Sequence, residues 1–516
     1  MRISTHLLIA AAAMAVTANG VRATVLDQIG VTQLRSIKPA LTGAGVILAQ
    51  VEASLGGTDD FEVNPAPLSA AITGGSRTFI YGNYLNQVSY TFSSGSYSSH
   101  AQTVANNFYG SNGPVDGAIT VYNFDSNDFA DNYVFAGKAP PAGLAVVNQS
   151  FIYPDLTAGT NEGVDFYFDA YTGRFNTLFV SAIGNGQTTY TSPSSYINAP
   201  STSYNGIAVA AYGGPTVYGP TFDGRSKPDI SAPASATSFA APLVSGAAAL
   251  LIQAGRQGVG GGSVAAATDP RTVKALLLNG AVKPTGWTHT ATAPLDERWG
   301  AGIVNVYNSY QTLAAGIKNP TQQSAAPLGQ TGPIITSGTA ESGSSGWAYR
   351  SITSSITFNA VDNYLLNIGS GQTLTATLVW NRQLWQFNIN NLDLYLYNSK
   401  GSLIALSDSS VDNVQQIYAT GLTAGLYDLK VVKAGGTSEV SPSEIYSLAY
   451  SAIGGTVPTT PAITPTTPPP TVTTTGNLWW GPSPSASASA APEPGTLVML
   501  ALGSLLVLPR RRRVTT

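Results

Sequence analysis

The chain has 516 residues, of which 24 are Lys or Arg, 27 are Asp or Glu, three are His and none is Cys. Without cysteine there is no thiol nucleophile, no disulfide and no Cys-based zinc or iron–sulfur site, and a mechanism that needs histidine has few candidates. With a formal net charge of -3, the chain lacks the excess of basic residues that nucleic-acid-binding proteins have, so we expect no nucleic-acid partner.

The first 23 residues have the pattern of a secretory signal peptide. Arg2 precedes an apolar run over residues 7–16, and small residues up to Ala23 offer cleavage points. The alternative, the first core helix of a cytosolic protein, fits less well because the run is short and a polar, helix-breaking stretch follows it at once. We therefore predict an exported protein, extracellular or in the cell envelope, that loses His6 with its signal.

The C-terminal segment predicts a linker and a sorting signal. Residues 456–490 are rich in Thr, Pro and Ser, which favours an extended linker. Residues 491–516 contain Pro-Glu-Pro, an apolar stretch long enough for a short transmembrane segment, and four arginines. This order resembles the PEP-CTERM signal of exopolysaccharide-producing bacteria, and it implies an exosortase-type sorting partner; a plain tail anchor is the alternative. Either way, the C-terminal segment contacts the membrane and the bulk of the protein lies outside the cytoplasm.

The segment 24–315 has the pattern of an α/β domain. Short apolar, β-branched runs alternate with Gly-rich turns and with Ala- and Leu-rich helical stretches. This order predicts a mostly parallel sheet flanked by helices, with its ligand site at the carboxyl ends of the strands. The clearest predicted strands are 45–51, 144–151, 177–185 and 206–212, and the clearest helix is 238–255.

The segment 330–455 has a different texture, in which polar and apolar residues alternate over short strands. Predicted strands begin near Thr373, Leu392, Leu426 and Tyr446, and turns such as NSKGS separate them. This pattern predicts an antiparallel β-sandwich as a second domain.

Ser238 is the first candidate for a chemical role. A hydrolase without Cys must use Ser, Thr, a pair of acids or a metal, and Ser238 opens the predicted helix SFAAPLVSGAAALL. A hydroxyl there lies at the positive end of the helix, beside N–H groups that can face a developing oxyanion. Pro242 is acceptable in a first turn, which needs no intrahelical donors. Taken alone, a serine at a helix start is most often only a cap.

Four sequence blocks together resemble the subtilisin-like (S8) serine peptidases. KPDISAP..ATSFAAPLVSGAAALL around Ser238 is similar to the family's GTSxAxPxVxGxxALL, and His100 in SSHAQTVANNFYG stands in the HGTHVAG position. Asn185 in FVSAIGNGQ matches the AAGN block, and Glu52 in GVILAQVEAS stands where the family has its acid. The blocks follow the family's order, and the resemblance covers roughly residues 41–315.

The resemblance implies a serine endopeptidase that hydrolyses a polypeptide substrate. His100 would take the proton of the Ser238 hydroxyl and pass it to the leaving amine, and Glu52 would orient the imidazole. The Asn185 amide and the Ser238 backbone N–H would hold the oxyanion. No cofactor is required. His289 has no matching acid block, and we interpret it as structural.

The sequence departs from the family at the acid and at several small residues. The extra methylene of Glu52 lengthens the side chain by roughly 1.5 Å, and Asp59 and Asp60 are alternative acids. Larger residues than the family's also stand at three positions: Ala101, Ala236 and Phe151. These departures motivate a second hypothesis, a catalytically weak or inactive surface protein that binds peptide or matrix polysaccharide. A third, a sedolisin-type Glu-Asp-Ser acid peptidase, leaves His100 unexplained.

Residues 392–452 resemble the PPC-like β-sandwich that accompanies many secreted peptidases, through D-L-Y-L-Y and G-L-x-A-G-x-Y-x-L. Asp393, Asp408 and Asp412 are candidate calcium ligands, but their spacing matches no dense ligand loop such as the EF-hand. We interpret them as turn and strand-edge carboxylates, so structural calcium is possible but not indicated. Four aromatic residues are expected to pack the sandwich: Trp380, Trp385, Tyr395 and Tyr397.

Overall fold

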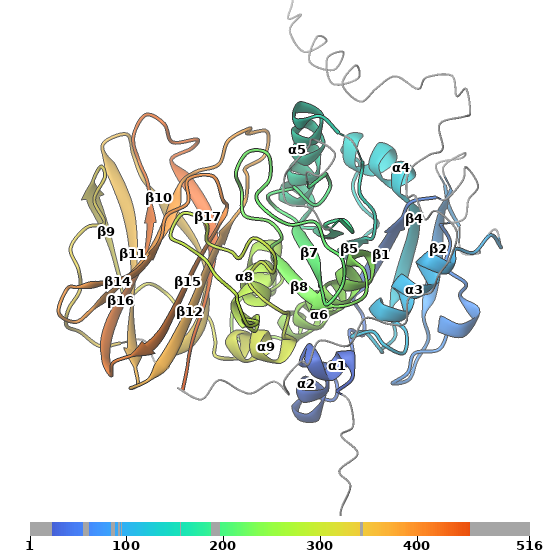
Figure 1. The fold of residues 1–516 in the computed structure, drawn as a ribbon, viewed down its shortest axis with the longest axis horizontal. Helices are drawn as coiled ribbons and strands as arrows, with labels where there is room; N and C mark the ends of the chain where they lie inside the picture. Colours follow the sequence, from blue (N-terminus) through green and yellow to red (C-terminus); the bar gives the residue numbers. More distant parts are fainter. Residues whose placement is uncertain are drawn as a thin grey trace, which may run out of the picture.

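The structure, a computed structural model, describes residues 23–54, 61–83, 88–90, 93, 95–154, 156–186, 197–340 and 344–454. The predicted signal up to residue 22, the predicted linker and the predicted sorting segment lie outside the described residues, as do Asp59 and Asp60. The ribbon has an α/β part on one side and two packed sheets on the other (Figure 1).

The α/β part is built on one eight-stranded sheet with the order β3-β2-β4-β1-β5-β6-β7-β8. All its neighbouring strands pair in parallel except β3, which runs antiparallel to β2 at the edge. The strands span Ile47–Glu52 (β1), Thr78–Asn83 (β2), Val88–Tyr90 (β3), Thr120–Asp125 (β4), Leu144–Gln149 (β5), Leu178–Ala182 (β6), Ile207–Tyr212 (β7) and Ile230–Pro233 (β8). The predicted mostly parallel sheet is confirmed.

Helices cover both faces of this sheet, as its continuous apolar strands require. Leu48 and Val146 point to the face covered by α3, α6, α8 and α9, whereas Ala49 and Val147 point to the face covered by α4 and α5. The helices span Val25–Gln28 (α1), Val31–Ile37 (α2), Ser99–Phe108 (α3), Ser126–Phe129 (α4), Ala158–Phe175 (α5), Thr237–Arg256 (α6), Val264–Ala267 (α7), Pro270–Gly280 (α8) and Val306–Ala314 (α9), with a 3₁₀ turn at Ala66–Leu68 and a π-helical segment at Ala130–Phe135.

Helix α6 runs through the core of the α/β part. Within the described residues it is the one helix long and apolar enough to cross a membrane, but 89% of its most apolar window is buried inside the protein, as in the core helix of a folded domain. The helix begins at Thr237, so Pro242 is its sixth residue and lies beyond the first turn. The expectation that Pro242 sits in the first turn is therefore wrong, and its missing N–H has a consequence for the site.

The second part is an antiparallel β-sandwich, as predicted. One sheet has the order β10-β17-β12-β15 and the other β14-β13-β16-β11-β9. Alternate residues such as Leu378, Leu394 and Tyr446 from both sheets form a shared apolar core. The strands span Gln322–Pro327 (β9), Ser345–Thr353 (β10), Phe358–Ile368 (β11), Gln372–Trp380 (β12), Leu392–Asn398 (β13), Leu403–Ser407 (β14), Val414–Leu422 (β15), Gly425–Lys433 (β16) and Ser443–Ile453 (β17).

The aromatic residues of the sandwich are only partly core residues. Trp380 is fully buried, in line with its predicted packing role, and Tyr395 and Tyr397 are partly buried. Trp385 differs, since it is 57% exposed and has a φ of 63° in the loop between β12 and β13. Its ring packs on Phe166 of α5, 5.7 Å away between centroids. Trp385 therefore covers the α/β part instead of filling the sandwich.

The two parts meet through a buried, partly polar interface. Helix α8 lies against β12 and β17 (Figure 1). The Thr272 and Ser447 hydroxyls are 2.8 Å apart, and the Lys283 ammonium donates to the Gln416 amide oxygen at 2.9 Å. Arg382 of the sandwich side is 1% exposed and lies 2.9 Å from the Asp169 carboxylate of α5.

We expect Arg382→Leu to lower the free energy of unfolding by about 3–5 kcal/mol, because it leaves the buried Asp169 charge without its cation. Equilibrium urea denaturation of the full chain measures this loss. Arg174→Leu, at an exposed position of the same helix as Asp169, is the matched control. Adding Asp169→Asn to Arg382→Leu should recover part of the loss; equal losses in the control and Arg382→Leu would contradict the role of this ion pair.

Candidate active site

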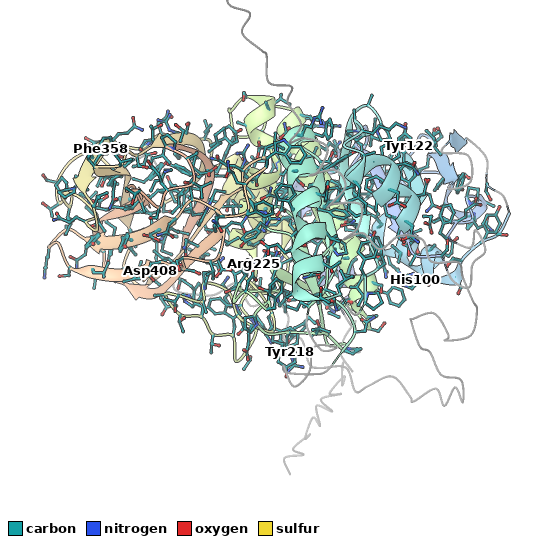
Figure 2. The ribbon with its side chains drawn as sticks, turned by 90° about the horizontal axis from the view of Figure 1, so that it is seen from above. His100, Tyr122, Tyr218, Arg225, Phe358 and Asp408 are labelled. Atoms are coloured by element: carbon teal, nitrogen blue, oxygen red, sulfur yellow. The ribbon has the colours of Figure 1, made fainter. Side chains whose placement is uncertain are left out.

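The four candidate residues lie at the carboxyl edge of the parallel strands. Glu52 ends β1, Asn185 follows β6 by three residues, and Ser238 is the second residue of α6, which follows β8. His100 is the second residue of α3, whose start is capped by the Ser98 hydroxyl. His100 lies in the part of the molecule far from the sandwich (Figure 2).

Glu52 and His100 form the pair expected of an acid and a general base. One Glu52 carboxylate oxygen lies 2.9 Å from His100 Nδ1, and the Gln50 amide donates to the other at 2.9 Å. Gln50 is itself fixed, because it donates to the Ala101 carbonyl at 2.8 Å and accepts from the Tyr109 hydroxyl at 2.6 Å. With Glu52 1% exposed, this network holds the longer acid in contact with the imidazole.

The protonation of His100 is set by burial and by Glu52. Burial favours the neutral ring, but the hydrogen bond to Glu52 and the negative charge of Glu52 outweigh it and raise the pKa of His100 above its ordinary value. The hydrogen bond to Glu52 is made by Nδ1, so a proton exchanged with a nucleophile would be carried by Nε2.

Helices α3 and α6 pack together, and this packing brings His100 to the start of α6. The ring of Phe239, the residue after Ser238, has its centroid 5.6 Å from that of the His100 imidazole. Ser238 is 9% exposed and lies in the first turn of α6, where backbone N–H groups lack intrahelical acceptors. The nucleophile candidate and the base candidate are therefore neighbours in the fold.

Pro242 changes the hydrogen bonding of Ser238. In a regular helix, the N–H of residue 242 would donate to the carbonyl of Ser238, but proline has no N–H. The Ser150 hydroxyl donates to that carbonyl instead, at 2.8 Å, and accepts from the Asn148 amide at 2.9 Å. Ser245, also on α6, donates to the Asn148 amide oxygen at 3.0 Å. The end of β5 thus fixes the backbone of Ser238.

Asn185 is oriented by Thr237. Its amide oxygen accepts from the Thr237 backbone N–H at 2.8 Å and from the Thr237 hydroxyl at 2.9 Å. Gly184 before it has a φ of 109°, a conformation that favours glycine, and its N–H donates to the same hydroxyl at 3.2 Å. Because the oxygen is held by these donors, the amide nitrogen of the exposed Asn185 points elsewhere and can donate to a ligand.

We expect Asn185→Ala to lower kcat by about 10²–10³-fold with KM little changed, because an oxyanion donor acts mainly in the transition state. Steady-state kinetics on a peptide substrate measures this split. Asn388→Ala, at an exposed position of the sandwich, is the control and should match the wild type. A rise in KM without a fall in kcat would assign Asn185 to substrate binding alone.

The larger side chains at family positions are accommodated. Ala101 is fully buried and its carbonyl accepts from Gln50, and Ala236 has an extended backbone (φ -155°, ψ 155°) that requires no glycine. Phe151 is 8% exposed and packs on Tyr153, 5.3 Å away between centroids, so it forms part of the core. His289 packs on Trp287 at 4.8 Å between ring centroids, in the segment between α8 and α9, which contains none of the four candidates.

Three supporting residues were missed in the sequence: Gln50, Ser150 and Thr237. Gln50 had a usable signal, since residues two apart on a strand share a face and Gln50 precedes Glu52 by two. Thr237 belongs to the Ala-Thr-Ser block around Ser238. The role of Ser150 depends on a contact between residues 88 apart in sequence, which no local pattern indicates.

A family comparison matches the central part of the α/β domain. Residues 117–302 match the model of the subtilase family, Peptidase_S8. This match supports a serine peptidase of the subtilase type. The matched stretch contains Asn185 and Ser238, whereas Glu52 and His100 precede it.

Three solved structures to which the chain is similar are distant from it in sequence. The CspB protease of Clostridium perfringens is 14% identical, with a TM-score of 0.44 and coverage of 56% of this chain and 97% of that chain. A structure of subtilase cytotoxin SubAB is 17% identical with a TM-score of 0.38, and the match covers 56% of this chain and 96% of that chain. Tripeptidyl peptidase 2 is 12% identical with a TM-score of 0.34, and the match covers 72% of this chain but only 41% of that enzyme. No curated protein sequence matches the chain significantly.

Proposed function

We propose that this protein is a serine endopeptidase that uses Ser238 as nucleophile, His100 as general base and Glu52 as the acid that orients His100. The observation that carries the proposal is the 2.9 Å contact between Glu52 and His100 Nδ1, on a ring that also packs against the residue following Ser238. A structural histidine would not need a buried carboxylate at Nδ1 together with the serine-bearing first turn of a helix packed against its ring.

The proposed reaction begins with attack by Ser238 Oγ on the carbonyl carbon of a peptide bond, while His100 Nε2 takes the hydroxyl proton. The Asn185 amide and the N–H groups of the first turn of α6 stabilise the oxyanion. When the C–N bond breaks, His100 returns the proton to the departing amine and an acyl-enzyme remains. A water molecule, deprotonated by His100, then attacks the ester and releases the acid product and free Ser238.

We further propose that the protein acts outside the cytoplasm, after export and C-terminal sorting at the membrane. This part rests on the patterns of residues 1–23 and 491–516 in the sequence. The substrate class is polypeptide, and the mechanism of the proposed site requires no metal or organic cofactor.

Labelling with a fluorophosphonate tests the proposed function. The reagent should modify the wild-type chain at Ser238 and should not modify Ser238→Ala. Ser235→Ala is the matched control, because it removes an exposed hydroxyl three residues away and should label like the wild type. No labelling of the folded wild type, together with no cleavage of an unfolded protein substrate, would overturn the proposal.

The second candidate is a catalytically weak or inactive surface protein that binds peptide or matrix polysaccharide. It is favoured by the Glu at the acid position and by the alanines at residues 101 and 236, where relatives have glycine. A folded wild type that fails to react with fluorophosphonate but binds peptide or polysaccharide would support it.

A further inference from the structure

The Gln50 amide lies between the proposed acid and the helix that carries the proposed base. Gln50 and Glu52 are two residues apart on β1, so their side chains share a face of the sheet. The amide nitrogen of Gln50 donates one hydrogen to the Glu52 carboxylate at 2.9 Å and the other to the Ala101 carbonyl at 2.8 Å. A single NH₂ group therefore binds both the carboxylate and the backbone of the residue that follows His100.

Gln50 is attached to both ends of helix α3. Ala101 is the third residue of α3, and Tyr109 is the residue at its C-terminal cap. The Tyr109 hydroxyl donates to the Gln50 amide oxygen at 2.6 Å. Gln50 and Tyr109 are fully buried, so water does not compete for these hydrogen bonds. Through Gln50, the position of the acid on β1 is tied to the helix that carries His100.

The orientation of the Gln50 amide is fixed by the chemistry of its partners. A carboxylate and a backbone carbonyl only accept hydrogen bonds, so the amide nitrogen must face Glu52 and Ala101. The amide oxygen then faces Tyr109, which must donate. Burial is the main cause that raises the pKa of Tyr109 well above its ordinary value, so its hydroxyl keeps the proton that it donates.

We infer, on the basis of the proposed function, that Gln50, held by Tyr109, is a positioning residue that makes the site specific for glutamate at position 52. The Glu52 carboxylate contacts His100 Nδ1 with one oxygen and Gln50 with the other, each at 2.9 Å. An aspartate on the same strand would retract the carboxylate by roughly 1.5 Å and could not keep both contacts. Gln50 and Glu52 therefore form a matched pair.

Glu52→Asp is the sharpest test of this matched pair, because it introduces the shorter acid of the family that the sequence resembles. It should lower kcat by about 10²-fold with KM little changed, since a displacement of about 1 Å at a catalytic group has an effect of that size. Gln50→Leu removes all three hydrogen bonds of the amide and should lower kcat to a similar extent. Steady-state kinetics of the full-length protein on a peptide substrate measures both losses.

Tyr109→Phe should lower kcat by about 10-fold, the equivalent of one hydrogen bond, because the amide stays but its oxygen loses its donor. Tyr81→Phe is the matched control, since it removes another buried tyrosine hydroxyl, which donates to a backbone carbonyl at 3.0 Å. The control for Gln50→Leu is Gln253→Leu, which removes a buried amide of α6 that binds two backbone groups, at 2.7 and 3.0 Å. Both controls should lower the melting temperature but keep the wild-type kcat.

The pKa of His100, measured by NMR on full-length protein with isotope-labelled histidine, gives a readout that needs no turnover. Contact with Glu52 raises this pKa, so Glu52→Asp and Gln50→Leu, which loosen the contact, should each lower it. His289 is the internal reference, and its pKa should stay the same. A substitution that only destabilised the fold would leave the pKa of His100 in the remaining folded protein unchanged.

Wild-type kcat in Glu52→Asp, or an unchanged His100 pKa in Gln50→Leu, would overturn the matched pair and leave the proposed peptidase in place. A higher His100 pKa in Gln50→Leu would also overturn it, because the amide would then only withdraw charge from the carboxylate. No turnover and no fluorophosphonate labelling of the wild type would overturn the proposed function instead. The NMR titration would still decide the role of Gln50 in that case.

Discussion

Replacing His100 by Ala is expected to lower kcat on a peptide substrate by about 10⁶-fold, because the nucleophile and its base act as one unit. The variant should fold, since the imidazole is partly exposed and the α3 cap at Ser98 is retained. Turnover of a fluorogenic peptide, measured with a circular dichroism spectrum of each sample, checks both points. KM should change little, because the base interacts mainly in the transition state.

The matched control is His289→Ala, which removes the other described histidine and should keep the wild-type kcat. Robust wild-type turnover that His100→Ala abolishes would contradict the hypothesis of an inactive binding protein. Equal turnover in wild type and His100→Ala would contradict the proposed base. An activity optimum near pH 4 that survives this substitution would instead favour an acid peptidase.

Glu52→Gln is expected to lower kcat by about 10⁴-fold and to shift the pH profile. His100 must be neutral to accept the Ser238 proton, so activity rises as the pH passes the His100 pKa. Glu52 raises that pKa. In the wild type, the rise of kcat/KM with pH should therefore have its midpoint above the ordinary pKa of histidine. Without the carboxylate charge, burial lowers the pKa of His100. The midpoint of the rise should therefore move to lower pH in a plot of kcat/KM against pH.

Glu297→Gln, at an exposed loop position, is the control and should leave both kcat and this midpoint unchanged. The experiment also separates Glu52 from the alternative acids. An unchanged profile in Glu52→Gln, with a shifted one in Asp59→Asn or Asp60→Asn, would assign the acid to the segment after β1.

The fold class could be predicted because parallel strands buried on both faces are rich in apolar residues. Strands β1, β5, β6 and β7 are mainly apolar, and each was found in the sequence to within a few residues. Strand β4 was not singled out, because its sequence TVYNFD is half polar. Helix α5 was also missed, since Gly159, Gly163 and Gly173 lower its intrinsic helix propensity and only packing stabilises it.

The candidate site could be predicted as a set of residues but not as a network. Motif order was enough to select Glu52 and His100, which the structure brings into contact. The fit of a glutamate, however, depends on Gln50 and Tyr109, whose hydrogen bonds join segments 51 and 59 residues apart in sequence. Pairwise contacts of this kind are not encoded in local composition, so they require the folded chain.

The link between Ser150 and the carbonyl of Ser238 has a mechanical consequence. Pro242 cannot donate to that carbonyl. A side chain from the end of β5 therefore makes the hydrogen bond that the helix backbone would otherwise supply at the start of α6. A movement of the segment after β5 would then pull on the backbone that carries the proposed nucleophile. The end of β5 and the start of α6 should therefore shift together, with the Ser150 hydroxyl as the link between them.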